Sequence, residues 1–342
     1  MSRAAVAVIG PIAARGEALS SRQRFAIATL ILMAASALLA GWAPLGFSIV
    51  TVFLFAGPHN LIEARYFMGR LPGRWGPLRT YFLFSAAGVL GLTASFAALP
   101  WLAGSLAWES DGWQTGIALW NTALVVWIVA LIQMRSRQRP RRDWFWTVPV
   151  AFALLAVNWL SPAAWDLGLV YLHPLVALWI LDRELRRSRP EWRPAYHACL
   201  ACLPIMLGLL WWRLADSPSL PGDDVLSVRI TQHAGADILQ GISSHLLVAA
   251  HTFLETLHYS VWLIAIPLVG LKTAPWNLRS VPLTWHSSGW KIGLGCVLAA
   301  GVGIVLVLWA CFLADYPTTR DVYFTVAMLH VLAEVPFLLR AL

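Results

Sequence analysis

Five histidines and three glutamates interrupt stretches of this sequence that are otherwise apolar. Imidazole and carboxylate groups bind metals, carry protons and act as general acids and bases. They occur in "PHNLIEA" (His59, Glu63), "LHPL" (His173), "HTFLETLHYS" (His251, Glu255, His258) and "LHVLAE" (His330, Glu334). On a helix, residues at i, i+4 and i+7 share one face, so the groups of each motif point in one direction.

The composition places these motifs in a membrane protein. Of 342 residues, 59% are hydrophobic and only 12% are charged, against about one quarter charged in soluble proteins. The net charge of +8 comes from arginines in short clusters between apolar runs, where they act as topology signals, so nucleic-acid binding is excluded. The expected fold class is all-α, a polytopic membrane helical bundle.

Ten segments have the length and hydropathy of membrane spans. They cover about 25-42, 46-67, 80-102, 115-134, 144-161, 163-182, 196-214, 242-270, 292-314 and 321-341. Arginines gather before the first span and then in alternate loops, at 65-79, 135-142 and 183-193. The positive-inside rule therefore predicts that both termini are cytoplasmic and that the protein lies in a bacterial cytoplasmic membrane.

Three regions follow from this topology. Residues 1-24 are predicted to be a cytoplasmic tail, and residues 25-342 a single transmembrane domain. The loop at about 215-241, which contains one short β-prone patch, "VLSVRI", is predicted to be extracytoplasmic and to form a lid or an interfacial segment.

Depth within the membrane gives a second reason to group the eight polar residues. All lie on even-numbered spans, which run in the same direction, and counting about 1.5 Å per residue places the five histidines and Glu334 roughly 12 to 22 Å below the outer surface of a core of about 30 Å. They are predicted to form one layer. The same count leaves out the residues at span ends and in loops, namely Asp182, His197, His233, His245 and His286.

A buried layer of this kind requires compensation by a metal or by protons, because ionisable groups are expensive in a membrane. The predicted ligands are His59, His173, His251, Glu255, His258 and His330, while Glu255, Glu63 and Glu334 are also predicted to take part in catalysis or to orient the imidazoles. Imidazole with carboxylate and no thiolate favours iron, as one or two ions, ahead of zinc or manganese. Cys199 and Cys202 are interpreted as packing residues.

The motifs resemble those of the Brp/Blh family of membrane β-carotene-cleaving dioxygenases. "AGPHNLIEA" is similar to the family's first histidine motif, His251 with His258 to its late histidine pair, and "LHVLAEVPF" to its last-helix motif. The resemblance implies iron held by His59, His251, His258 and His330, with His173 as the remaining ligand. Asn60 replaces a family glycine, and the late pair is spaced by seven residues with Glu255 between, which leaves a two-metal centre open.

The sequence thus predicts a membrane-embedded non-haem iron oxygenase. Its substrate would be a lipophilic molecule from the bilayer, such as a carotenoid, another isoprenoid or an acyl chain, and membrane lipids or a redox partner could contact its arginines. Two alternatives stay open. A haem- or quinone-linked electron carrier would use paired histidines, and a proton or metal-ion transporter would use the same His and Glu layer as a relay.

Overall fold

The structure is a bundle of helices. This computed structural model describes residues 19–138, 144–271, 274–285 and 287–341, and no strand occurs within these ranges. The α-helices are α1 (Ser21–Trp42), α2 (Pro44–Met68), α3 (Arg79–Ser105), α4 (Ser110–Gln138), α5 (Thr147–Leu160), α6 (Pro162–Ser188), α7 (Arg193–Leu214), α8 (Val225–His233), α9 (Ser244–Ser260), α10 (Ile266–Val269), α11 (Ser288–Ala314) and α12 (Tyr316–Ala341). Short 3₁₀ turns cover Gly76–Leu78, Pro190–Trp192, Leu278–Ser280 and Pro282–Trp285.

Every predicted span corresponds to a helix, which confirms the all-α membrane bundle. Among the described residues, nine helical segments are long and apolar enough to cross a membrane. The fifth predicted span, α5, has only 14 residues. The eighth is composite, since α9 continues through a π-helical turn, Val261–Ala265, into α10.

The β-prone patch of the long loop is helical and forms most of α8. The Asp224 side chain caps this helix by accepting hydrogen bonds from the backbone N–H and the hydroxyl of Ser227, at 2.9 and 2.6 Å. These bonds lower the pKa of Asp224. A satisfied N-cap stabilises the first turn of a short helix, and here, with tertiary packing, it outweighs the local preference for strand.

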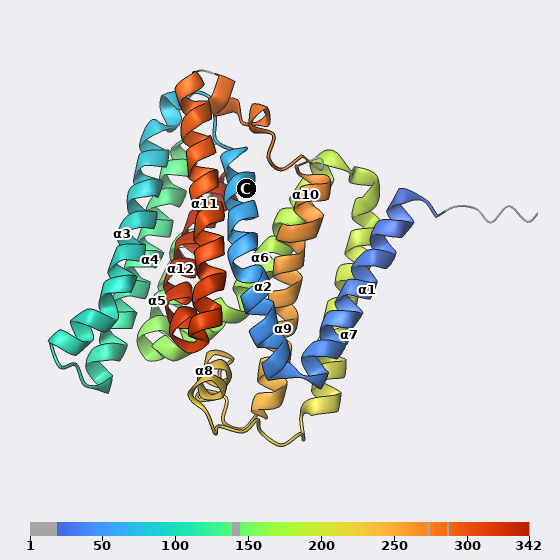
Figure 1. Ribbon diagram of the computed structural model, residues 1–342. Helices are drawn as coiled ribbons and strands as arrows, with labels where there is room; N and C mark the ends of the chain where they lie inside the picture. The colour runs from blue at the N-terminus through green and yellow to red at the C-terminus, as the bar shows by residue number, and fades with distance from the viewer. Residues whose placement is uncertain (1–18, 139–143, 272–273, 286, 342) are drawn as a thin grey trace, which may run out of the picture.

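The four helices that carry the predicted layer run in the same direction. Figure 1 shows α2, α6, α9 and α12 rising from the end of the bundle near α8 towards the opposite end, where α1 begins and α12 ends. These four helices contact one another in the pairs α2–α9, α6–α9, α2–α12 and α6–α12. Residues at equal depth on them can therefore meet.

Helix α9 is the central element. The span that it begins, Ser244–Val269, has 67% of its most apolar 18-residue stretch buried, more than any other span described. Phe253, Leu254 and Leu257 pack against α1 and α7, where Met33 and Leu210 belong to the same buried cluster. This packing fixes the rotation of α9 about its axis and leaves its polar face towards α2, α6 and α12.

Helices α3 and α4 pack closely where a glycine of α3 faces a tryptophan of α4. A Cβ atom on Gly88 would lie 1.9 Å from Nε1 of Trp127, whose ring is buried. One turn further along α3, Gly91 has open space around it. Gly88 therefore permits the close approach of the two helices.

We predict that Gly88→Ala lowers the free energy of unfolding by about 1–3 kcal/mol, because the added methyl group forces the buried indole out of its position. Gly91→Ala is the matched control, and it should change stability by no more than about 1 kcal/mol, in the stabilising direction. Thermal or denaturant unfolding in detergent measures both. Equal stability of the two variants would contradict this packing.

Candidate metal centre

Four side chains from three helices converge in the interior of the bundle. His59 and Glu63 come from α2, His258 from α9 and His330 from α12, and one potential ligand atom from each lies within 4.8 Å of all the others. The ring centroid of His59 is 5.2 Å from those of both His258 and His330. Three imidazoles and one carboxylate at this separation form a plausible binding set for a transition metal.

Two further predicted residues adjoin this set. His173 of α6 places its Nε2 3.2 Å from Nε2 of His330 and its Nδ1 3.5 Å from Oε2 of Glu334. Its ring centroid lies 4.7 Å from that of His258. The structure thus brings together His59, Glu63, His173, His258, His330 and Glu334, which we call the central cluster.

The hydrogen bonding of the central cluster leaves ligand atoms unused. The carbonyl oxygen of Phe55 can only accept, so Nδ1 of His59, 3.0 Å away, must carry the proton, and the lone pair is then on Nε2. Nε2 of His59 is buried and has no hydrogen-bond partner. A histidine whose other nitrogen donates to a backbone carbonyl is the usual arrangement for a metal ligand.

The same lack of partners extends across the central cluster. The buried atoms without a hydrogen-bond partner include Nδ1 and Nε2 of His258, Nδ1 of His330, Oε2 of Glu63 and Oε1 of Glu334. A buried polar atom that remains unpaired costs about 1–3 kcal/mol. Several such atoms facing one another form a set with which an ion or another ligand could pair.

His251 and Glu255 line the neighbouring cavity but are separate from the four converging side chains. The ring of His251 contacts that of His233, with centroids 5.0 Å apart, and Oε1 of Glu255 accepts a hydrogen bond of 2.6 Å from Tyr259. His251 is not among the four described side chains that converge, and it lies seven residues from His258, a rise of about 10.5 Å. This spacing could have been recognised from the sequence.

His233 was wrongly left out of the layer by counting residues. It ends α8, which turns back over the site, and its ring lies 4.5 Å from that of Phe324 on α12. Burial lowers the pKa of His233 well below its usual range, and the nearby His251 and Arg320 lower it further. Only the fold of the loop brings this imidazole against the ring of His251.

The other histidines left out of the layer have separate partners. Nε2 of His197 lies 2.6 Å from Asp182, which also accepts two hydrogen bonds from Arg193. Nε2 of His245 lies 3.2 Å from the carbonyl of Gly41. His286 is outside the described residues.

A cavity of about 150 Å³ joins the two groups of histidines. Its polar wall consists of His59, His173, His233, His251, Glu255, His258 and His330, while Leu169, Val170, Ala327, Met328 and Val331 supply much of the apolar wall. A second cavity, of about 300 Å³, reaches Glu63 and His330 from between α2 and α12. The central cluster is therefore accessible to an apolar molecule from two sides.

Backbone irregularities surround the site. The π-helical turn Val261–Ala265 begins three residues after His258, and prolines at 58, 174 and 336 lie one or two residues from His59, His173 and Glu334. A proline inside a helix removes one backbone hydrogen bond, and π-helical turns are frequent at functional sites. These features shift the local helix geometry where the polar side chains must converge.

No protein-family model, curated protein or solved structure matches this chain. The resemblance to carotenoid-cleaving dioxygenases therefore stays a prediction.

We predict that protein purified in mild detergent contains one or two equivalents of iron, and that His258→Ala reduces this content at least about tenfold because it removes a central ligand. His245→Ala, on the same helix but bonded to Gly41, is the control and should keep its metal. Metal analysis by mass spectrometry checks both, together with an absorption spectrum. Full occupancy in His258→Ala, or a Soret band from haem, would contradict the assignment.

Proposed function

We propose that this protein is a membrane-embedded non-haem iron oxidoreductase that uses O₂ to oxidise a lipophilic substrate. The observation that carries the proposal is the set of buried, unpartnered imidazole and carboxylate atoms beside an otherwise apolar cavity. Such a set is costly unless an ion pairs with it. Imidazole mixed with carboxylate, without thiolate, suits iron ahead of zinc or manganese.

In this proposal His59, His258 and His330 hold the metal with Glu63. One iron ion bound there would supply O₂ activation and one-electron chemistry, which protein side chains lack. His173 and Glu334 complete the central cluster, either by orienting the His330 ring or by holding a second ion. Nδ1–H of His59 donates to Phe55, which keeps the ring orientation fixed before any ion binds.

Glu255 and Tyr259 have a distinct part in the proposal. The Tyr259 hydroxyl donates to Glu255 at 2.6 Å, and both residues line the cavity. The Tyr259 ring also lies 4.3 Å, centroid to centroid, from that of His59. The pair can hold a proton between the cavity and the metal ligands, which gives Glu255 a role in proton transfer instead of metal binding.

The lining of the two cavities supports a lipophilic substrate. Apart from the ionisable wall, the residues are mainly aliphatic or aromatic, and the bundle exposes apolar side chains on its outer helices. A carotenoid, another isoprenoid or an acyl chain fits this chemistry. Entry from the bilayer avoids the cost of carrying such a molecule through water.

We predict that purified, iron-loaded protein consumes O₂ only when a lipid extract containing carotenoids, isoprenoids and acyl lipids is supplied. The rate of O₂ consumption should be at least about tenfold lower in His258→Ala, because this variant lacks a metal ligand. His245→Ala should consume O₂ at the wild-type rate. An oxygen electrode gives the rate, and mass spectrometry of the extract identifies the oxidised lipid. O₂ uptake that is independent of lipid would argue against a lipid oxidase.

We also predict that filling the cavity separates metal binding from turnover. Ala327→Phe places a phenyl ring in the cavity of about 150 Å³, so substrate should be excluded while the metal content is unchanged. Ala300→Phe, at an exposed position of α11, is the control and should leave turnover unchanged. Normal turnover in Ala327→Phe would show that the substrate does not use this cavity.

A further inference from the structure

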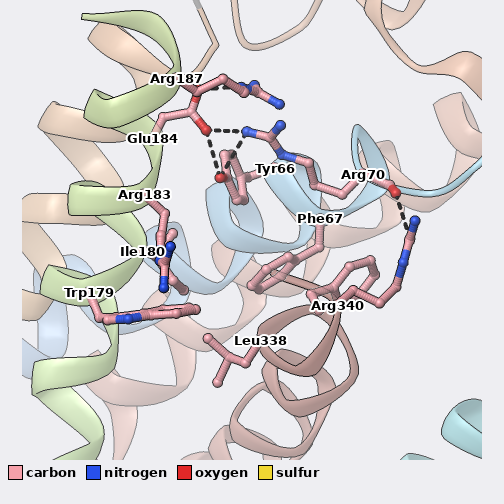
Figure 2. Close-up of a pocket in the computed structure, with 11 residues that line it drawn as sticks. Tyr66, Phe67, Arg70, Trp179, Ile180, Arg183, Glu184, Arg187, Leu338 and Arg340 are labelled. Atoms are coloured by element: carbon pink, nitrogen blue, oxygen red, sulfur yellow. Dashed lines mark hydrogen bonds and ion pairs between the residues drawn. The ribbon is translucent and has the colours of Figure 1, made fainter. Parts of the chain in front are cut away.

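A third cavity lies at the arginine-rich end of the bundle. It has a volume of about 270 Å³ and lies between α2, α6 and α12, three of the four helices that carry the central cluster. Figure 2 shows its charged side chains, among them Arg70, Arg183, Arg187 and Arg340, around aromatic and aliphatic side chains. We call it the arginine cavity.

Positive charge exceeds negative charge in the arginine cavity. Four arginines line it, with Glu184 as the one carboxylate among the lining residues described. Glu184 forms ion pairs with Arg70 and Arg187, and it accepts a hydrogen bond of 2.9 Å from Tyr66. Even without Arg340, the guanidinium groups of Arg70, Arg183 and Arg187 outnumber the carboxylate of Glu184 among the described lining residues, so an excess of positive charge faces the cavity.

Arg183 has no carboxylate partner within the part of the chain that the structure describes. Its guanidinium lies over the Trp179 ring, 5.0 Å from the centroid, and its Nε is buried with no hydrogen-bond partner among these residues. A guanidinium stacked on an indole is rigid and keeps its N–H groups available for an oxyanion. This unpaired donor is the feature that points to a ligand.

The remainder of the arginine cavity is apolar. Phe67 and Phe337 stack with centroids 4.6 Å apart and line both this cavity and the one that reaches Glu63 and His330. Arg70 lies two residues beyond the end of α2 and seven residues after Glu63 in the chain. One pair of phenyl rings thus borders both the arginine cavity and the cavity that reaches the central cluster.

We propose that the arginine cavity binds the anionic head, a phosphate or carboxylate, of an amphiphile whose apolar chain runs along the Phe67–Phe337 stack towards the central cluster. Guanidinium groups bind both oxyanions by paired hydrogen bonds, and arginine-rich pockets between membrane helices suit lipid heads. The identification of this amphiphile as the substrate rests on the proposed oxidoreductase function. The head site itself does not.

Native mass spectrometry with dodecyl phosphate tests the head site. We expect one bound dodecyl phosphate per protein, and about tenfold weaker binding in the double variant Arg183→Gln, Arg187→Gln, because two charge-assisted contacts are lost. Arg186→Gln is the matched control, since Arg186 is exposed on the same turn of α6 but does not line the cavity. Equal weakening by Arg186→Gln, or equal binding of zwitterionic dodecylphosphocholine, would overturn the proposal.

Two further experiments are needed. One distinguishes a lipid head from free phosphate as the bound anion, and the other distinguishes failure of the head site from failure of the oxidoreductase proposal. Inorganic phosphate should compete poorly with dodecyl phosphate, and equally effective competition would show a site for free phosphate instead.

His258→Ala should bind dodecyl phosphate like the wild type, so that the head site can be tested even when the metal is lost. If the amphiphile is the substrate, the double arginine variant raises KM for an anionic chain at unchanged metal content, and an unchanged KM would overturn that identification.

Discussion

The whole structure depends on how the bundle accommodates polar atoms that have no partner among its own residues. Nε2 of His59, both ring nitrogens of His258 and Oε2 of Glu63 are buried without hydrogen bonds. In an apolar interior such atoms oppose folding unless something else pairs with them. The proposed cation would resolve this, because lone pairs that are unfavourable in isolation become ligands when they converge.

The architecture follows from bringing these atoms to one point. Helices α2, α6, α9 and α12 run in the same direction, so residues at one depth can meet only through the packing of these four. Buried apolar contacts to α1 and α7 hold α9 with its polar face inward. Helix α8 then covers the end of the site, where Ile230 and Ala234 pack on Leu247 and Val248 of α9.

The two polar regions of the interior differ in chemistry. The central cluster is rich in lone pairs and attracts a cation, whereas the arginine cavity is rich in N–H donors and attracts an anion. They lie at different heights on the same helices, with the stacked rings of Phe67 and Phe337 between the cavities. A molecule with an anionic head and an apolar chain complements both regions at once, and this gives the two proposals a common physical basis.

The sequence by itself determined the long apolar helices and the common direction of the four that carry the polar residues. These properties depend on hydropathy, arginine position and a constant rise per residue, all of which are local. The tertiary structure decided which residues meet, because depth does not fix the rotation of a helix or the course of a loop. His258 therefore joins His59 and His330, while His251, two turns away on the same face, meets His233. The position of His233 depends on α8 turning back over the site, and that turn is stabilised by contacts with α9 and α12 that are distant in the chain.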